Sequence, residues 1–178
     1  MILPDVLVPG LHLVLCGTAP SRASKEAGAY YAKPGNLFWP TLHAVGLTPE
    51  RLAPADYARV LEFGIGLTDL NKTEWGADHE LSRGSFDAAG LLAKIERYRP
   101  AAVAFDSKTA GRAFLGRPVH YGRQPETPFG TLVVVVPSPS GRARAFWDVG
   151  PWRDVGAFVA RRRAQAADQA VSRTLRRP

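Results

Sequence analysis

The chain has 178 residues, of which 46% are hydrophobic and 22% charged, and it contains one cysteine. This length is enough for one well-buried core and too short for two ordinary domains, so we expect a single domain. One cysteine excludes an internal disulfide and any zinc or iron–sulfur site built from several cysteines of this chain. The first ten residues carry an acid and two prolines, unlike a signal peptide, and no later apolar run could cross a bilayer. We therefore expect an intracellular, cytoplasmic protein with no membrane segment.

The basic residues exceed the acidic ones by 23 to 16, a net charge of +7 that is compatible with a polyanionic partner. Residues 152–178 hold seven arginines and two aspartates, whereas residues 1–151 hold sixteen basic and fourteen acidic residues. Most of the chain is thus nearly balanced, and charge alone does not identify the partner. We assign residues 1–160 to the domain and residues 161–178 to a basic helical extension or tail. Its arginines either contact phosphate or lie on a solvated helix face.

Strand-like and helix-like segments alternate along the chain. Four apolar runs are typical of strands: residues 11–16, 65–70, 101–105 and 131–136. Five segments with helical spacing lie among them: residues 36–45, 54–63, 85–99, 107–115 and 152–170. Strands separated by helices indicate parallel pairing, with helices on both faces of the sheet. We therefore predict a single-domain, three-layer α/β/α fold with a four-stranded parallel central sheet.

Two further details of this pattern can be tested against a structure. Ser85 is expected to cap the helix at residues 85–99, and Pro100 to end it. Residues 116–130, with three prolines and three glycines, are expected to form an ordered excursion before the last strand. We assign no chemistry to that excursion.

Two loops are candidates for a functional site. Small residues at 17–21 follow the first predicted strand, and the aromatic-rich stretch at 30–39 comes next. Residues 137–144, rich in Pro, Ser and Arg, follow the last predicted strand. The carboxyl ends of parallel strands are where open α/β sheets bind ligands, so we expect both loops to open on the same edge of the sheet.

These loops, with Gly64-Ile65-Gly66-Leu67-Thr68-Asp69 between them, form four motifs in a specific order. Together they resemble the mismatch-specific uracil-DNA glycosylase and thymine-DNA glycosylase branch of the uracil-DNA glycosylase superfamily, from about residue 11 to residue 158. The first motif is atypical, because Ala19 stands where the branch carries its catalytic Asn. Asp69 stands where the branch carries a second Asn.

The resemblance implies a DNA repair enzyme that hydrolyses the N-glycosidic bond of uracil in DNA and leaves an abasic site. It implies DNA and water as substrates, a monomer, and no cofactor. One alternative is a related glycosylase for hypoxanthine, xanthine or mismatched thymine. Another is a DNA- or base-binding module that kept the fold and lost catalysis, for which Ala19 is the best argument.

Base recognition is assigned to several positions. Tyr31 matches the family's aromatic that stacks on a flipped pyrimidine, although it could also be a loop aromatic that packs on the sheet. The backbone amides of residues 17–19 (Gly17, Thr18 and Ala19) can donate to the oxygen that becomes negative as the base departs. Asn36 either caps the following helix or contacts the base. Ser138 stands where several branches carry His or Asn, so its contribution to stabilising the base oxygen is expected to be weaker.

Asp69 is the catalytic candidate, because it lies near the end of the second predicted strand, close to the first loop. Its carboxylate could orient or deprotonate water and favour a sugar cation, or, if protonated, hydrogen-bond to the base edge. The alternatives are a capped loop or a salt bridge with Lys72. Asp106 precedes Ser107 and is interpreted as a helix cap or first-turn charge. The polar run Asp78-His79-Glu80 lacks further ligands at suitable spacing, so no metal site is predicted.

The last loop is assigned to DNA. Arg142 matches the position from which the thymine-DNA glycosylase pattern inserts an arginine into the gap left by a flipped nucleotide. Ser140 and Gly141 can bring backbone amides to phosphate oxygens, and Arg144 can add charge. The alternative is a solvated arginine loop.

Overall fold

The central sheet has five strands. The computed structural model describes residues 1–82 and 84–175, so the last three residues of the predicted extension lie outside the described part. The strands lie in the order β2-β1-β3-β5-β4: β1 (Leu13–Gly17), β2 (Ile65–Asp69), β3 (Ala102–Phe105), β4 (Gly122–Arg123) and β5 (Leu132–Val135). β1 pairs in parallel with β2 and β3, and β3 pairs in parallel with β5. The three-layer α/β fold is therefore confirmed.

The strand count differs from the prediction by one. β4 lies within the excursion at residues 116–130 and pairs antiparallel with β5, Gly122 opposite Val135. Two residues are too few to show the alternation by which a strand is recognised in a sequence. The prediction of a wholly parallel four-stranded sheet is wrong at this edge.

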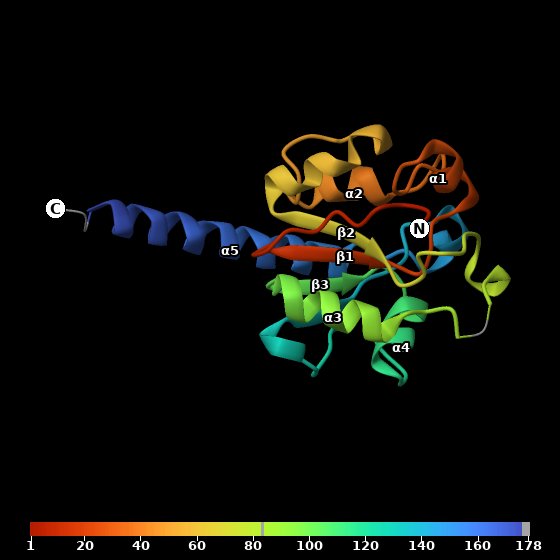
Figure 1. Cartoon of the computed structure of the whole chain (residues 1–178). Coiled ribbons are helices and arrows are strands. Elements are labelled where there is room, and N and C mark those ends of the chain that lie inside the picture. Colours follow the sequence, from red (N-terminus) through yellow and green to blue (C-terminus); the bar gives the residue numbers. More distant parts are fainter. Residues whose placement is uncertain (83, 176–178) are drawn as a thin grey trace.

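Helices cover both faces of the sheet (Figure 1). One face packs on α2 (Phe38–Ala44), the 3₁₀ helix η1 (Pro54–Phe63) and the start of α5 (Gly150–Leu175). The other face packs on α3 (Ala88–Tyr98) and α4 (Lys108–Leu115). Alternate strand residues thus enter two different cores, which explains why the valine run of β5 shows no polar alternation.

Local capping explains where the helices begin. Ser21 caps a short helix, α1 (Arg22–Ala27), that the sequence pattern did not reveal. Asp87 rather than Ser85 caps α3, because its Oδ1 accepts from the Gly90 amide at 2.8 Å. The α4 helix is capped by Ser107, whose Oγ accepts from the Ala110 amide at 3.0 Å. Asp106 is therefore not the cap of that helix, contrary to the prediction.

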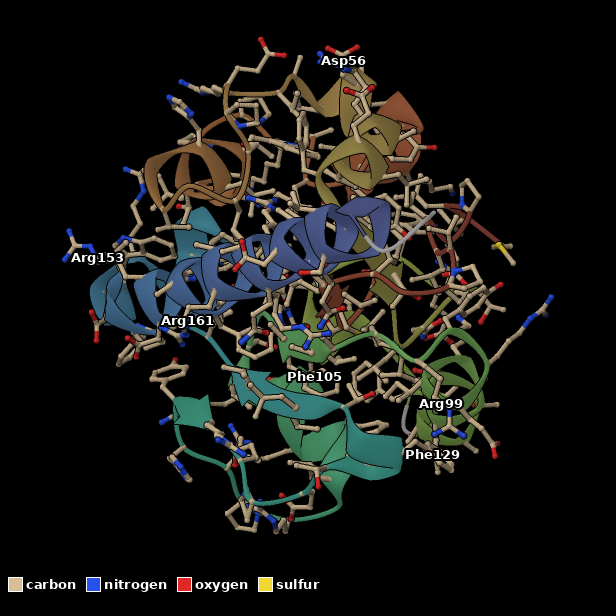
Figure 2. All side chains as sticks on the ribbon, turned by 90° about the vertical axis from the view of Figure 1, so that its left-hand side faces the viewer. Asp56, Arg99, Phe105, Phe129, Arg153 and Arg161 are labelled. Carbon is tan, nitrogen blue, oxygen red and sulfur yellow. The ribbon has the colours of Figure 1, made fainter. Side chains whose placement is uncertain are left out.

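The α5 helix runs back along the sheet and extends beyond the amino ends of the strands, to the left in Figure 1. Figure 2 looks at this end of the molecule and shows Arg161 on the projecting helix. Near the same end, Arg163 donates to the carbonyls of Gly46, Leu47 and Phe63 at 3.1, 2.7 and 2.7 Å. These bonds join α5 to the ends of α2 and η1. No helix in the described part of the chain is both long and apolar enough to span a membrane.

Candidate active site

Three strands bring polar groups to the carboxyl edge of the sheet, on the right in Figure 1. Gly17 ends β1, directly opposite Asp69 at the end of β2. Asp106 follows β3, and its amide donates to the Cys16 carbonyl at 3.2 Å. The parallel register thus places Asp69 and Asp106 on either side of the last residue of β1.

Gly17 allows these groups to approach one another. A Cβ atom at this position would lie 2.6 Å from Asp69 Oδ1, 3.5 Å from the Tyr31 hydroxyl and 3.6 Å from Asp106 Oδ2. Any larger residue would therefore collide with the Asp69 carboxyl. The absence of a side chain at the end of β1 makes room for two carboxyls and a phenol around one point.

Asp69 is a buried acid with unused hydrogen-bonding capacity. Its side chain is 4% exposed, and Oδ2 has no hydrogen-bond partner among the described residues. Burial raises the pKa of Asp69 to about 7; Lys72 and Lys94 oppose this shift, and Asp5 adds to it. A carboxyl with this pKa changes protonation state near neutral pH, as a general acid or base should.

Lys72 does not form the salt bridge with Asp69 that the sequence left open. Its ammonium pairs with Asp5 at 2.8 Å, and Lys94 pairs with the other oxygen of Asp5 at 2.7 Å. These cations act on Asp69 only through space. Neither lysine therefore forms an ion pair with the Asp69 carboxyl.

Asp106 is the functional candidate that the sequence interpretation missed. It is 7% exposed, and burial raises its pKa to about 7; Tyr31 opposes this shift, whereas the nearby charges of Asp69 and Asp78 add to it. The two buried carboxyls of Asp69 and Asp106 therefore disfavour each other's ionisation. The argument that selected Asp69, an acid at the carboxyl end of a parallel strand, applies equally to Asp106.

Tyr31 joins the site to the neighbouring helix. Its ring stacks on Phe38 with centroids 3.6 Å apart and planes 9° apart. Its hydroxyl interacts electrostatically with Asp106 but forms no hydrogen bond of ordinary geometry. The backbone at Tyr31 has φ +53°, an uncommon value for a residue with a side chain and one that occurs preferentially at functional sites. The ring packs internally, as one interpretation expects, and the hydroxyl reaches the site; stacking of the ring on a base stays a prediction.

The other residues assigned to the base lie nearby with different roles. Asn36 Oδ1 accepts from the Phe38 amide at 2.8 Å, a turn contact just before α2, whereas Leu37 holds the N-cap position without a side-chain bond. The Thr18 hydroxyl donates to Asp78 Oδ1 at 2.7 Å. Within the described residues, the amides of Thr18 and Ala19 donate to no other part of the chain. Two backbone donors are thus available beside the carboxyl pair.

The last loop lies against the aromatic-rich one. The Leu37 amide donates to the Pro139 carbonyl at 2.9 Å, and Arg144 donates to the Gly35 carbonyl at 3.3 Å. Ser138 Oγ accepts from the amide of Ser140, and Ser140 Oγ caps the 3₁₀ helix η4 (Gly141–Phe146).

Within η4, Gly141 and Arg142 are exposed, so the predicted DNA-contacting residues lie at the surface of the same edge. In the described part of the chain, no group of three or more His, Cys, Asp and Glu side chains could hold a metal ion.

Comparison with known proteins places this geometry in a family. The family model described as "Uracil DNA glycosylase superfamily" matches residues 4–154. The fold is similar to the solution NMR structure of a "putative Uracil DNA glycosylase" from Methanosarcina acetivorans, with a TM-score of 0.64 and 25% sequence identity. That likeness covers 89% of this chain and 96% of the other. The chain therefore belongs to the uracil DNA glycosylase superfamily, and its reaction class is that of a DNA glycosylase.

Proposed function

We propose that this protein removes uracil from DNA by hydrolysing its N-glycosidic bond, as a monomer of the mismatch-specific and thymine-DNA glycosylase branch, without a cofactor. The observation that carries the proposal is the buried Asp69 carboxyl, which has one oxygen without a partner beside the available amides of Thr18 and Ala19. An unpaired polar atom in a buried position indicates a site that a ligand or water completes.

In the proposed reaction, the ionised Asp69 orients a water molecule toward C1′ of the sugar. The bond between C1′ and the base nitrogen breaks, and its electron pair leaves with the base. The water oxygen bonds to C1′, and its proton passes to Asp69. The amides of Thr18 and Ala19 donate to the base oxygen on which negative charge develops. No side chain is needed at Ala19 for this role.

Tyr31 and Arg142 complete the proposed recognition of an extruded nucleotide. The ring of Tyr31, supported from one side by Phe38, is the candidate for stacking on the base. Arg142 is exposed on η4, where its guanidinium can enter the gap that the nucleotide leaves. Asn36 remains a candidate base contact through its amide nitrogen, since its oxygen is occupied by the Phe38 amide.

Single-turnover excision assays on a panel of duplexes test the proposal. The duplexes carry uracil, hypoxanthine, xanthine or mismatched thymine in one sequence context, and an abasic product is detected by strand cleavage in alkali. We expect uracil to be excised fastest. Faster excision of another base would reassign the substrate, and binding without excision of any base would identify a non-catalytic module.

A further inference from the structure

Two cations are held in place beside the active site by an aromatic ring. The guanidinium of Arg22 lies 5.1 Å and the ammonium of Lys25 lies 4.3 Å from the ring centroid of Trp75. Both cations are exposed on α1, the helix that follows the first loop, whereas Trp75 is half-buried in the segment after β2. The ring limits the conformations of both side chains, which therefore lose less entropy when they bind an anion.

The segment that carries Trp75 also carries two exposed acids that lie against the site. The Gly76 amide donates to the Pro20 carbonyl at 3.0 Å, which ties this segment to the first loop. Asp78 Oδ1 accepts from the Thr18 hydroxyl at 2.7 Å. Glu80 Oε2 accepts from the Ala77 amide at 2.6 Å, and this bond, together with the charges of His79, Arg142 and Arg22, lowers the pKa of Glu80. Asp78 and Glu80 thus lie among hydroxyl and cationic groups of the kind that bind phosphate.

DNA must bring its phosphates to this same edge, because the carboxyl pair and the Arg142 loop are both here. The carboxylates of Asp78 and Glu80 repel those phosphates and compete with them for the nearby cations. We propose that Arg22 and Lys25 bind phosphates that flank the target nucleotide, and that Asp78 and Glu80 occupy this surface until DNA displaces them. The inference rests on DNA as substrate and does not depend on which base is excised.

The proposed phosphate-binding surface is tested by measuring the equilibrium binding of DNA to the protein at several salt concentrations. The probe is a duplex with one tetrahydrofuran abasic-site analogue, which cannot be cleaved, and its affinity is measured by fluorescence anisotropy. The double variant Asp78→Asn/Glu80→Gln should bind about two- to fivefold more tightly for each carboxylate removed, the range of exposed charge interactions. Arg22→Ala and Lys25→Ala should each bind more weakly, with a salt slope shallower by about 1.

Matched controls separate a local effect from a change of net charge. Glu96→Gln removes one exposed acid on α3, and Arg161→Ala removes one exposed arginine on α5, at the amino end of the strands. Both should bind this probe as the wild type does. Thermal unfolding and circular dichroism check that each variant is folded.

The proposal is overturned if the double variant binds no more tightly than Glu96→Gln, or if Arg22→Ala and Lys25→Ala keep the wild-type salt slope. If the acid variant does not fold, the two cation variants still decide the question. Failure of the wild type to excise uracil would alter the proposed substrate and leave these binding results unchanged.

Discussion

The two ends of the central sheet use charged residues in opposite ways. At the amino end, the guanidinium of Arg163 donates hydrogen bonds to three backbone carbonyls. A hollow of about 620 Å³ lies beside it and is lined in part by His12 and His43. At the carboxyl end, Asp69 Oδ2 and the Tyr31 hydroxyl are buried without hydrogen-bond partners among the described residues. Unsatisfied buried groups cost stability and are kept where a ligand completes them. Our proposed site therefore follows the buried unpaired polar atoms and not the size of a hollow.

The variant Asp69→Asn is the strongest test of this difference between the two ends of the sheet. This change deletes one charge with little change in volume, and we expect the single-turnover excision rate to fall about 100-fold, the lower range for a positioned acid or base. Binding to lesion DNA should change by less than about tenfold, because the shape of the site is kept. Asp56→Asn, on the exposed surface of η1 (Figure 2), is the matched control and should excise at the wild-type rate. Unchanged excision by Asp69→Asn would refute a catalytic carboxylate.

Arg163→Ala should have its effect on stability alone. Removal of the donor to three carbonyls should lower the free energy of unfolding by about 1.5–3 kcal/mol, measured by urea denaturation. The excision rate of the folded variant should equal that of the wild type. Arg161→Ala, two residues earlier on the same helix, controls for the lost charge. A loss of excision with unchanged stability would mean that the amino end takes part in the reaction.

Arg142→Ala should affect excision from duplexes more than from single strands. Extrusion of a base costs a few kcal/mol, least from a single strand, and a residue that fills the gap recovers part of this cost. We expect a loss of about tenfold on duplex substrates, which corresponds to about 1.4 kcal/mol, and a smaller loss on single strands. Equal losses on both substrates would instead make Arg142 a backbone contact.

The acid pair should produce opposite pH trends in activity and stability. Excision should increase as pH rises through about 7, because Asp69 must be ionised to activate water. Between pH about 4 and 7, the folded protein holds protons on Asp69 and Asp106 that the unfolded chain has released. The free energy of unfolding should therefore fall as the pH is raised through this range. Denaturation curves of the Asp69→Asn/Asp106→Asn variant should show a shallower fall. A parallel fall in both proteins would show that other groups dominate.

Sequence patterns located the edge of the sheet more reliably than the individual residues on it. The apolar runs and the loops that follow them were enough to place Gly17, Asp69 and the Arg142 loop together, because parallel strands share one carboxyl edge. Asp106 was missed because an acid before Ser107 also fits a local capping rule, and only the register with Cys16 shows that it faces Gly17. Local patterns do not contain that register.

Tertiary contacts also changed the interpretation of the arginine run at residues 161–163. Its composition indicates a solvated face, yet Arg163 is half-buried and bonded to two neighbouring elements. Residues on one helix turn face different directions, and the sequence does not show which of them meets the domain. The same reasoning applies to β4, whose two residues pair only because β5 lies beside them.

The direction of α5 has a practical consequence for biochemical handling. From Arg163, its last contact with the body described above, to Leu175 the helix advances about 18 Å, at 1.5 Å per residue. That length exceeds two Debye lengths at physiological ionic strength, which are about 8 Å each. Arg161, Arg162 and Arg163 likewise lie about 17–20 Å along α5 from its start at Gly150, so their charge is screened from the edge of the sheet that carries Asp69. Retention of this protein on heparin or a cation exchanger should therefore report the arginines of α5 and not the edge that carries Asp69.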